Sequence, residues 1–166
     1  PKPDQPPAAF RPTDMGNAER MVATHGADLR HCTAWGKWLV WDEARWREDD
    51  TDEVSRRAKS TVRAIGAEAK ANQNDDTAEW AEISESVTRI SALIKLAASE
   101  PAIPVTPAQL DADPWALNCL NGTINLKDGQ MHLHRREDMH TKLVPVAYSL
   151  TAEAPLWTAF LDKVMG

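Results

Sequence analysis

The sequence has few cysteines and no long apolar run. Its 166 residues include only Cys32 and Cys119, which stand far apart in the chain. Isolated cysteines are typical of reduced, buried small residues in an intracellular protein, so no disulfide is predicted. No apolar stretch approaches the roughly 20 residues that a membrane-spanning helix requires, and no basic-then-apolar leader is present. We therefore expect a soluble, cytoplasmic chain that is long enough to bury its own core.

The familiar catalytic templates are missing as well. The sequence has no glycine-rich loop ending in Gly-Lys-Ser/Thr, no Gly-x-Ser-x-Gly and no His-Glu-x-x-His. His132 and His134 would share one face of a strand, but no third metal ligand stands at a usable spacing. Asp111 and Asp113 could pair around Mg²⁺, although Asp-x-Asp before proline is more typical of a helix end and turn. The sequence predicts no catalytic residue, no cofactor and no metal site.

Basic residues are in the minority. The chain has 25 acidic and 19 basic residues and a net charge of −6, which weighs against a strong stand-alone nucleic-acid-binding protein. Two local basic sets, one on a helix and one after a hairpin, could still contact phosphates. A solvated helix face and internal pairing with Glu137 and Asp138 are the respective alternatives. The candidate DNA-binding residues are Arg56, Lys59, Arg63, Arg135, Arg136 and Lys142.

The first part of the chain changes from proline-rich to tryptophan-rich. Residues 1–12 are predicted to be a linker, and a helix capped by Thr13 or Asp14 is expected to run to Leu29. Alternation and turn residues then predict an antiparallel meander with strands near 30–34, 37–42 and 45–47. Trp35 and Trp41 in this meander could stack on bases. The alternative is a tryptophan-rich mini-core.

Two long helices are predicted next, over residues 48–100, as a helical hairpin that could form a subdomain. The first buries residues spaced by three or four positions from Val54 to Ala69. The second carries a heptad seam from Trp80 to Ala97 that is too short for an independent coiled coil, so packing within the domain is expected. Thr106 and Pro107 open a short helix that is predicted to end near Ala112.

The stretch from Pro114 to Lys142 combines alternation with turn signals. Asp128-Gly129 is a strong hairpin signal, and Asn121-Gly122 marks a second tight turn. A short strand over residues 143–148 and a helix from Thr151 complete the predicted fold. Four apolar residues are expected to attach the hairpin to the helices: Ile124, Leu126, Met131 and Leu133. The fold class is α+β, with small antiparallel meanders packed on a long helical hairpin between an N-terminal and a C-terminal helix.

The stretch LDADPWALNCLNGTINLKDGQMHLHRREDMHTKLVPVAY resembles a signature of the phage and plasmid primase–helicase family. That signature has an Asn-Gly-Thr-(Ile/Val)-Asp-Leu hairpin, then Gly, a His-(Arg/Lys)-x-x-Asp segment and Thr-Lys. The upstream segment from Thr13 to Trp46 is similar to the start of the same domain, so the resemblance covers roughly residues 13–162. Asn125 departs from the pattern, since the family more often has Asp there.

The resemblance implies a place in a larger protein. In such proteins this domain, here residues 13–166, precedes a superfamily 3 helicase ATPase, and it is related to the collar region of the poxvirus helicase–primase. ATP and Mg²⁺ are expected only in the downstream part. Because the chain begins at Pro1 without Met and stops at Gly166, we expect it to be a piece of a longer protein from a phage or plasmid, acting in the cytoplasm of a bacterial host.

Two functions follow as expectations. The first is a non-catalytic accessory domain that supports ring assembly and guides single-stranded or forked DNA, bound weakly, to the helicase motor. The second is a pure protein-interaction module that self-associates or binds the rest of its own chain without contacting DNA. The net charge and the heptad seam motivate the second. No membrane partner is expected.

Overall fold

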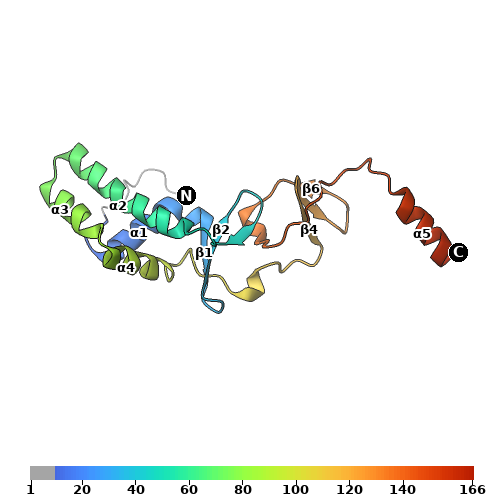
Figure 1. The fold of residues 1–166 in the computed structure, drawn as a ribbon, viewed down its shortest axis with the longest axis horizontal. Coiled ribbons are helices and arrows are strands. Elements are labelled where there is room, and N and C mark those ends of the chain that lie inside the picture. Colours follow the sequence, from blue (N-terminus) through green and yellow to red (C-terminus); the bar gives the residue numbers. More distant parts are fainter. Residues whose placement is uncertain (1–9) are drawn as a thin grey trace.

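The computed structural model describes residues 10–166 and shows an elongated molecule (Figure 1). A helical bundle forms one end, two small sheets follow in the middle, and a separate helix forms the other end. Most of the predicted linker, residues 1–9, lies outside the described residues. Helices and antiparallel sheets are segregated along the molecule, so the α+β prediction is confirmed.

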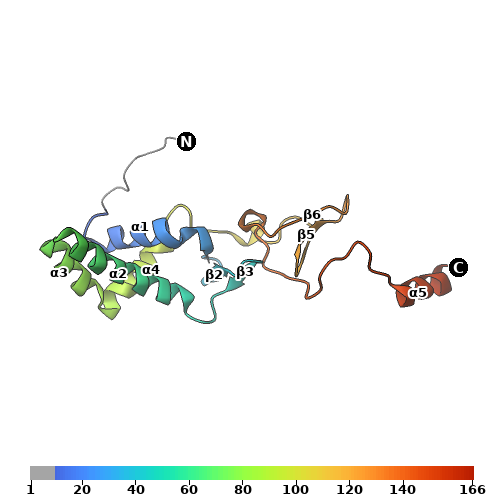
Figure 2. The ribbon, with the colours of Figure 1, turned by 90° about the horizontal axis from the view of Figure 1, so that it is seen from above.

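The bundle begins with α1 (Asp14–His25), whose start the sequence predicted. The Thr13 hydroxyl accepts a hydrogen bond from the Gly16 N–H at 3.0 Å, which satisfies one of the free donors of the first turn. The helix ends earlier than Leu29, because Gly26–Asp28 form a 3₁₀ turn that leads into the first strand. Together with the next three helices of the chain, α1 forms the helical bundle that Figure 2 shows from above.

The long helix α2 (Glu53–Asn72) buries the face that its periodicity predicted. Five of its side chains on that face are buried, and they are Val54, Ala58, Val62, Ile65 and Ala69. The residue at the N-cap position is Asp52, whose side chain makes no capping hydrogen bond. Instead the Asp49 carboxylate accepts from the N–H groups of Glu53 at 2.8 Å and Val54 at 2.9 Å, where the helix dipole favours an anion.

The predicted second long helix is two separate helices, so the prediction of a continuous heptad seam is wrong. α3 (Asp75–Ser84) ends where Asn17 of α1 donates a hydrogen bond to the Ser84 hydroxyl at 3.1 Å, and both residues are buried. α4 (Val87–Ala97) restarts behind Ser86, which caps it through the Arg89 N–H. Val87, a seam residue, is 82% exposed. A buried polar contact and a serine cap therefore redirect the chain in the middle of the periodic stretch.

The tryptophan-rich meander forms as predicted, with boundaries shifted by one or two residues. Its strands lie in the order β1-β2-β3 and pair antiparallel; they are β1 (Leu29–Cys32), β2 (Lys37–Trp41) and β3 (Trp46–Glu48). Trp46 is fully buried, and its ring centroid lies 5.6 Å from that of Trp41. Val105 and Leu110 pack against the same cluster. For Trp41 and Trp46, the mini-core interpretation is confirmed.

A second three-stranded antiparallel sheet follows, on the side of the meander away from the bundle (Figures 1 and 2). Its strands are β4 (Ala116–Cys119), β5 (Gly122–Asn125) and β6 (Met131–His132). Among the four apolar residues expected to attach the hairpin to the helices, only Ile124 is buried, whereas Leu126, Met131 and Leu133 are exposed. That prediction is wrong, because this sheet packs no face on the bundle.

The segments around the second sheet are less regular than predicted. The expected helix 106–112 is only the 3₁₀ turn Pro107–Gln109. The expected strand 143–148 makes a single bridge, between Val144 and Cys119. It is held in place by Asn121, whose side chain accepts from the Tyr148 N–H at 2.8 Å and donates to the Tyr148 carbonyl at 3.0 Å. Asn121 is therefore an anchor for this segment as well as a turn residue.

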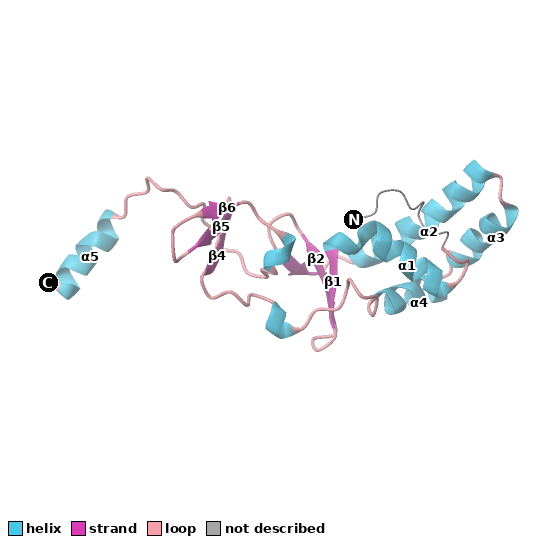
Figure 3. Ribbon diagram, turned by 180° about the vertical axis from the view of Figure 1, so that it is seen from behind, coloured by secondary structure: helices cyan, strands magenta, loops and turns pink. Residues whose placement is uncertain are grey.

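The last helix, α5 (Pro155–Met165), begins four residues later than predicted, where Pro155 suits the first helical position. Figure 3 shows it at the end of an extended segment, away from both sheets. None of its residues is buried, although Trp157 and Phe160 stack on each other with ring centroids 5.5 Å apart. Over the described residues, α5 is therefore set apart from the bundle and from both sheets.

Gly122 and Gly129 differ in what a side chain would meet, which predicts different effects of alanine. A Cβ at Gly122, with φ +148°, would lie 2.5 Å from the His132 carbonyl oxygen, whereas a Cβ at Gly129, with φ +72°, meets nothing within 4 Å. Gly122→Ala should lower the free energy of unfolding by about 2 kcal/mol or more. Gly129→Ala, the control, should cost about 1 kcal/mol. Urea denaturation measures both; equal losses would contradict the clash.

Candidate nucleic-acid interface

An ion-pair network connects the two basic sets that the sequence singled out. Arg136 donates to Asp28 at 2.6 Å, and the other oxygen of Asp28 lies 3.6 Å from the Arg57 guanidinium. Arg57 also donates to Glu53 at 3.0 Å, and Arg56 contacts the same carboxylate at 2.7 Å. These hydrogen bonds from Arg57 and Arg56 lower the pKa of Glu53. Sequence reasoning missed Asp28 and Arg57, because their pairing depends on tertiary structure.

This network occupies two of the six candidate DNA-binding residues. Arg56 also donates to the backbone carbonyl and the hydroxyl of Thr51. Arg136 places its guanidinium carbon 5.6 Å from the centre of the Trp41 ring. A phosphate would have to compete with these internal partners, and the DNA contacts of Arg56 and Arg136 stay predictions.

Lys59 and Arg63 lie on α2 outside this network. Both are exposed, and neither makes an ion pair with any of residues 10–166. With Val62 they line one side of a cavity of about 240 Å³, and Ile90 and Glu85 line the other. The cavity lies between α2 and α4, and these two cations line it on the α2 side. Glu85 is the acidic member of the described lining.

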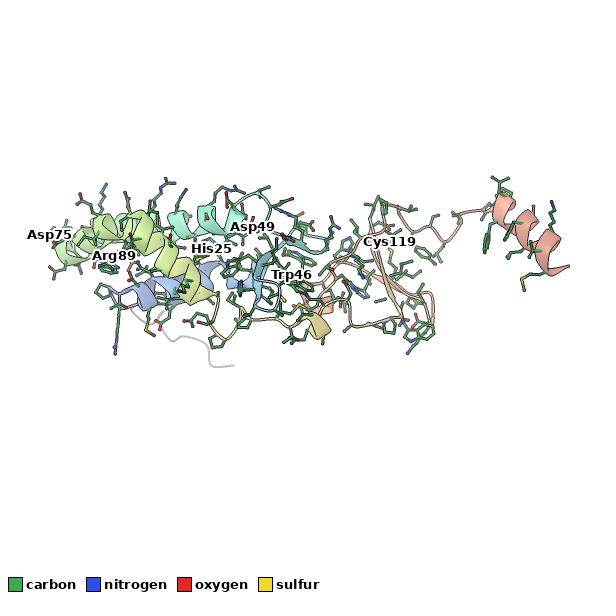
Figure 4. All side chains as sticks on the ribbon, turned by 60° about the horizontal axis from the view of Figure 1, so that its bottom comes forward. His25, Trp46, Asp49, Asp75, Arg89 and Cys119 are labelled. Carbon is green, nitrogen blue, oxygen red and sulfur yellow. The ribbon has the colours of Figure 1, made fainter. Side chains whose placement is uncertain are left out.

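The second basic set lies on the segment 135–144, which we call the strap. Arg135 is exposed and makes no ion pair within the described residues. The Lys142 side chain is 88% exposed, with its ammonium 4.0 Å from Asp111. Trp46 fixes the strap, since its indole N–H donates to the Arg136 carbonyl at 2.9 Å and its backbone N–H donates to the His140 carbonyl at 2.7 Å. Figure 4 shows Trp46 between the bundle and the sheet that holds Cys119.

Asp111 fastens the far side of the strap. Its carboxylate accepts hydrogen bonds from the hydroxyl and the N–H of Thr141, the latter at 2.8 Å. Burial opposes ionisation of this carboxyl, but the hydrogen bonds from Thr141 and Lys142 outweigh it and lower the pKa. Asp113 accepts instead from the Trp115 N–H at 2.9 Å. The two carboxylates therefore have separate structural roles, and the turn interpretation of this segment is confirmed.

The histidines of this region also have separate partners. His134 contacts the Asn118 side-chain oxygen at 2.9 Å, whereas the His132 ring lies 3.8 Å from Asp138. His140 is buried and has an unpartnered Nε2. His132, Asp138, His140 and Asp113 line one cavity of about 150 Å³. Over residues 10–166, however, no three His, Cys, Asp or Glu side chains are arranged to hold a metal ion.

The two tryptophans proposed for base stacking differ in exposure. Trp35 lies in the turn between β1 and β2 and is 48% exposed. Trp41 is only 9% exposed, and its ring packs against Trp46 on one side with Arg136 nearby. A base cannot stack on Trp41 without opening the mini-core. The burial of Trp41 weighs against base stacking at this residue, and the stacking hypothesis stays a prediction for both tryptophans.

A comparison with models of protein families identifies the family of this chain. The family model described as D5 N terminal like matches residues 18–166. The chain belongs to the D5 N-terminal-like family. Domains of this family are found in phage and plasmid primase–helicases, ahead of the superfamily 3 helicase. A search of curated proteins finds no match to the chain.

The D5 N-terminal-like match spans the bundle, both sheets and α5, so these parts belong to one family unit. It assigns no role to individual residues, and the candidate interface rests on the geometry above. Cys32 and Cys119 are both unpaired and buried, as predicted. Within the described residues, none of the helices is long and apolar enough to span a membrane.

The lowered pKa of Asp111 predicts a pH-dependent contribution to stability. A depressed carboxyl pKa stabilises the fold above the ordinary value near 4, and this contribution is lost as the pH falls through the folded-state pKa. Asp111→Asn should lower the free energy of unfolding at pH 7 by about 1–2 kcal/mol. Asn tolerates the positive φ of 50° at this position, so the substitution tests the charge.

The measurement is chemical denaturation of both proteins at pH 7 and below pH 4. The difference in free energy of unfolding should begin to shrink as the pH falls below the ordinary carboxyl value, and should go on shrinking as the pH passes through the lowered pKa of folded Asp111. The control is Asp128→Asn, at an exposed turn residue. A difference that stays constant with pH would show that the charge of Asp111 does not contribute.

Proposed function

We propose that this domain is a non-catalytic accessory part of a phage or plasmid replication primase–helicase. It guides single-stranded or forked DNA toward a downstream ATP-dependent helicase motor and supports assembly of the ring. Family membership supports the primase–helicase context. The sequence has no Gly-Lys-Ser/Thr phosphate-binding loop, so ATP and Mg²⁺ are assigned to the motor.

The observation that carries the DNA-guiding part is the exposed pair Lys59 and Arg63. A cation already bound to a carboxylate gains little from a phosphate, whereas an unpaired cation releases counterions when it binds one. Lys59 and Arg63 meet this condition, and so does Arg135, whereas the largely exposed Lys142 has its ammonium 4.0 Å from Asp111. The chain as a whole carries −6, so the affinity is weak and falls steeply with salt.

The first test measures the affinity of the chain for fluorescein-labelled single-stranded and forked DNA by fluorescence anisotropy. Lys59→Ala/Arg63→Ala should weaken binding several-fold at low salt, because two phosphate contacts are lost. The slope of log affinity against log salt should fall by about 0.7 for each contact with a single strand. Arg56→Ala should have a smaller effect, since Arg56 is held by Glu53 and Thr51.

The control is Lys70→Ala/Lys163→Ala, which changes the net charge by the same amount at positions outside the cavity between α2 and α4. If this control weakens binding equally, the effect comes from net charge and the assignment of Lys59 and Arg63 is wrong. If the wild-type chain binds neither DNA at low salt, the DNA-guiding function is wrong.

A second candidate function is self-association, and α5 is the observation that favours it. The heptad seam no longer supports this function, because the helix is interrupted at Glu85 and Ser86, between α3 and α4. α5 instead exposes Leu156, Trp157, Phe160 and Val164 without packing on the described body. An exposed apolar helix face of this kind is typical of a protein interaction site. A second copy, or the rest of its own chain, is the proposed partner.

Sedimentation velocity of the chain over a range of concentrations tests this function. The wild type should sediment increasingly as an oligomer as its concentration rises. Trp157→Ser/Phe160→Ser should remain monomeric with an unchanged melting temperature, because neither side chain is buried in the body. Leu150→Ser, at an exposed apolar residue outside α5, is the control. A wild type that stays monomeric throughout excludes self-association by this chain alone.

A further inference from the structure

A groove of about 480 Å³ lies between the β1–β2 hairpin and α4. The hairpin contributes His31 and Trp38, whose ring centroids lie 5.1 Å apart at an interplanar angle of 59°. α4 contributes Ile94 and Lys95, and the hydroxyls of Ser91 and Ser99 complete its polar rim. The groove therefore combines aromatic rings, one cation and hydroxyl groups. Its described lining has no acidic side chain.

This combination is suited to a nucleotide with an unpaired base. Aromatic faces stack on bases without regard to sequence, and a neighbouring cation contacts the phosphate. Trp38 is partly buried because it packs against the bundle core. Its position is therefore fixed before a ligand arrives, which lowers the entropic cost of stacking. Burial lowers the pKa of His31, so its ring is neutral at pH 7.

The groove and the cavity that Lys59 and Arg63 line both border α4. Ile90 belongs to that cavity and Ile94 belongs to the groove. Residues four apart on a helix lie on the same face, about 6 Å apart along its axis. The cavity and the groove therefore reach α4 about one helical turn apart. Trp35, at the tip of the β1–β2 hairpin, is the next exposed aromatic residue on the hairpin side.

We propose that this groove is a base-binding subsite for single-stranded nucleic acid. One base stacks on Trp38 beside His31, Lys95 contacts its phosphate, and Trp35 takes a neighbouring base at the hairpin tip. Lys59 and Arg63 hold the backbone one helical turn away. This inference rests on the proposed DNA-guiding function. It adds the residues that stack on unpaired bases and so favour a single strand over a duplex.

The test compares two labelled 20-mers with the same backbone charge, oligo-dT and an abasic sugar-phosphate strand, by fluorescence anisotropy on the 166-residue chain. Wild type should bind oligo-dT about tenfold or more tighter than the abasic strand, since stacking needs a base. Trp38→Leu and Trp35→Ala should each reduce this preference several-fold. Lys95→Ala should weaken binding of both strands by a similar factor, because the phosphate is common to them.

Trp115→Ala is the matched control, since Trp115 is 48% exposed, as Trp35 is, but lies beside the second sheet. It should leave the preference for oligo-dT unchanged. Trp35→Ala and Lys95→Ala alter exposed side chains, so they keep the test decisive even if Trp38→Leu lowers the melting temperature.

The outcomes separate this inference from the function on which it rests. Equal binding of both strands by wild type, with Lys59→Ala/Arg63→Ala still weakening it, overturns the base-binding subsite and leaves the DNA-guiding function standing. Equal losses of preference in Trp115→Ala and Trp35→Ala also overturn the subsite. If wild type binds neither strand at low salt, both proposals are wrong.

Discussion

Trp46 is the residue on which the junction between the two sheets depends. It is fully buried, with the Trp41 ring on one side and the Arg30 guanidinium carbon 4.6 Å from its ring centre. Both of its N–H groups donate to strap carbonyls, those of Arg136 and His140. A large buried aromatic side chain contributes about 3–5 kcal/mol to stability. The two hydrogen bonds of Trp46 fix which strap carbonyls lie against it. The strap therefore has one position relative to the meander.

The charged network is a consequence of this position. Ion pairs near the surface contribute only about 0–1 kcal/mol each, so the pairs from Arg136 to Asp28 and from Asp28 to Arg57 cannot by themselves place the strap against the bundle. With the Arg136 carbonyl held by Trp46, however, the Arg136 side chain reaches Asp28 with little further loss of entropy. Aromatic burial thus decides the geometry, and the ion pairs stabilise what is already in place.

Local patterns predicted those parts of the fold that depend on neighbouring residues. The buried face of α2 follows from a step of three or four residues, and the meander follows from alternation around turns; both are properties of a short stretch. The heptad seam failed because Ser84 is held by Asn17, 67 positions away. The prediction that Leu133 packs on the helices was wrong because alternation shows which side of a strand is apolar, but does not show whether another element covers that side.

The candidate interface shows the same limit. Sequence spacing placed Arg56, Lys59 and Arg63 on one helix, but which of them remain unpaired depends on Glu53, on Asp28 and on the strap. Likewise, Trp35 and Trp41 both belong to the tryptophan-rich segment of the sequence, but Trp35 is 48% exposed and Trp41 only 9%. The pairing of Trp38 with α4 depends on how the sheet packs on the bundle, and no local signal indicates that.

The elongated shape makes the two candidate functions compatible. The unpaired cations and the aromatic groove lie at the bundle and the meander, whereas the apolar helix α5 lies at the opposite end, beyond the second sheet (Figure 1). The residues used for one function are therefore not buried by the other. The acidic charge of the whole chain repels a nucleic acid except where cations are locally in excess, so the proposed DNA contacts are expected only at the bundle, the meander and the strap. Under the two proposals, one domain would hold a partner with α5 while its other end stays open to a DNA strand.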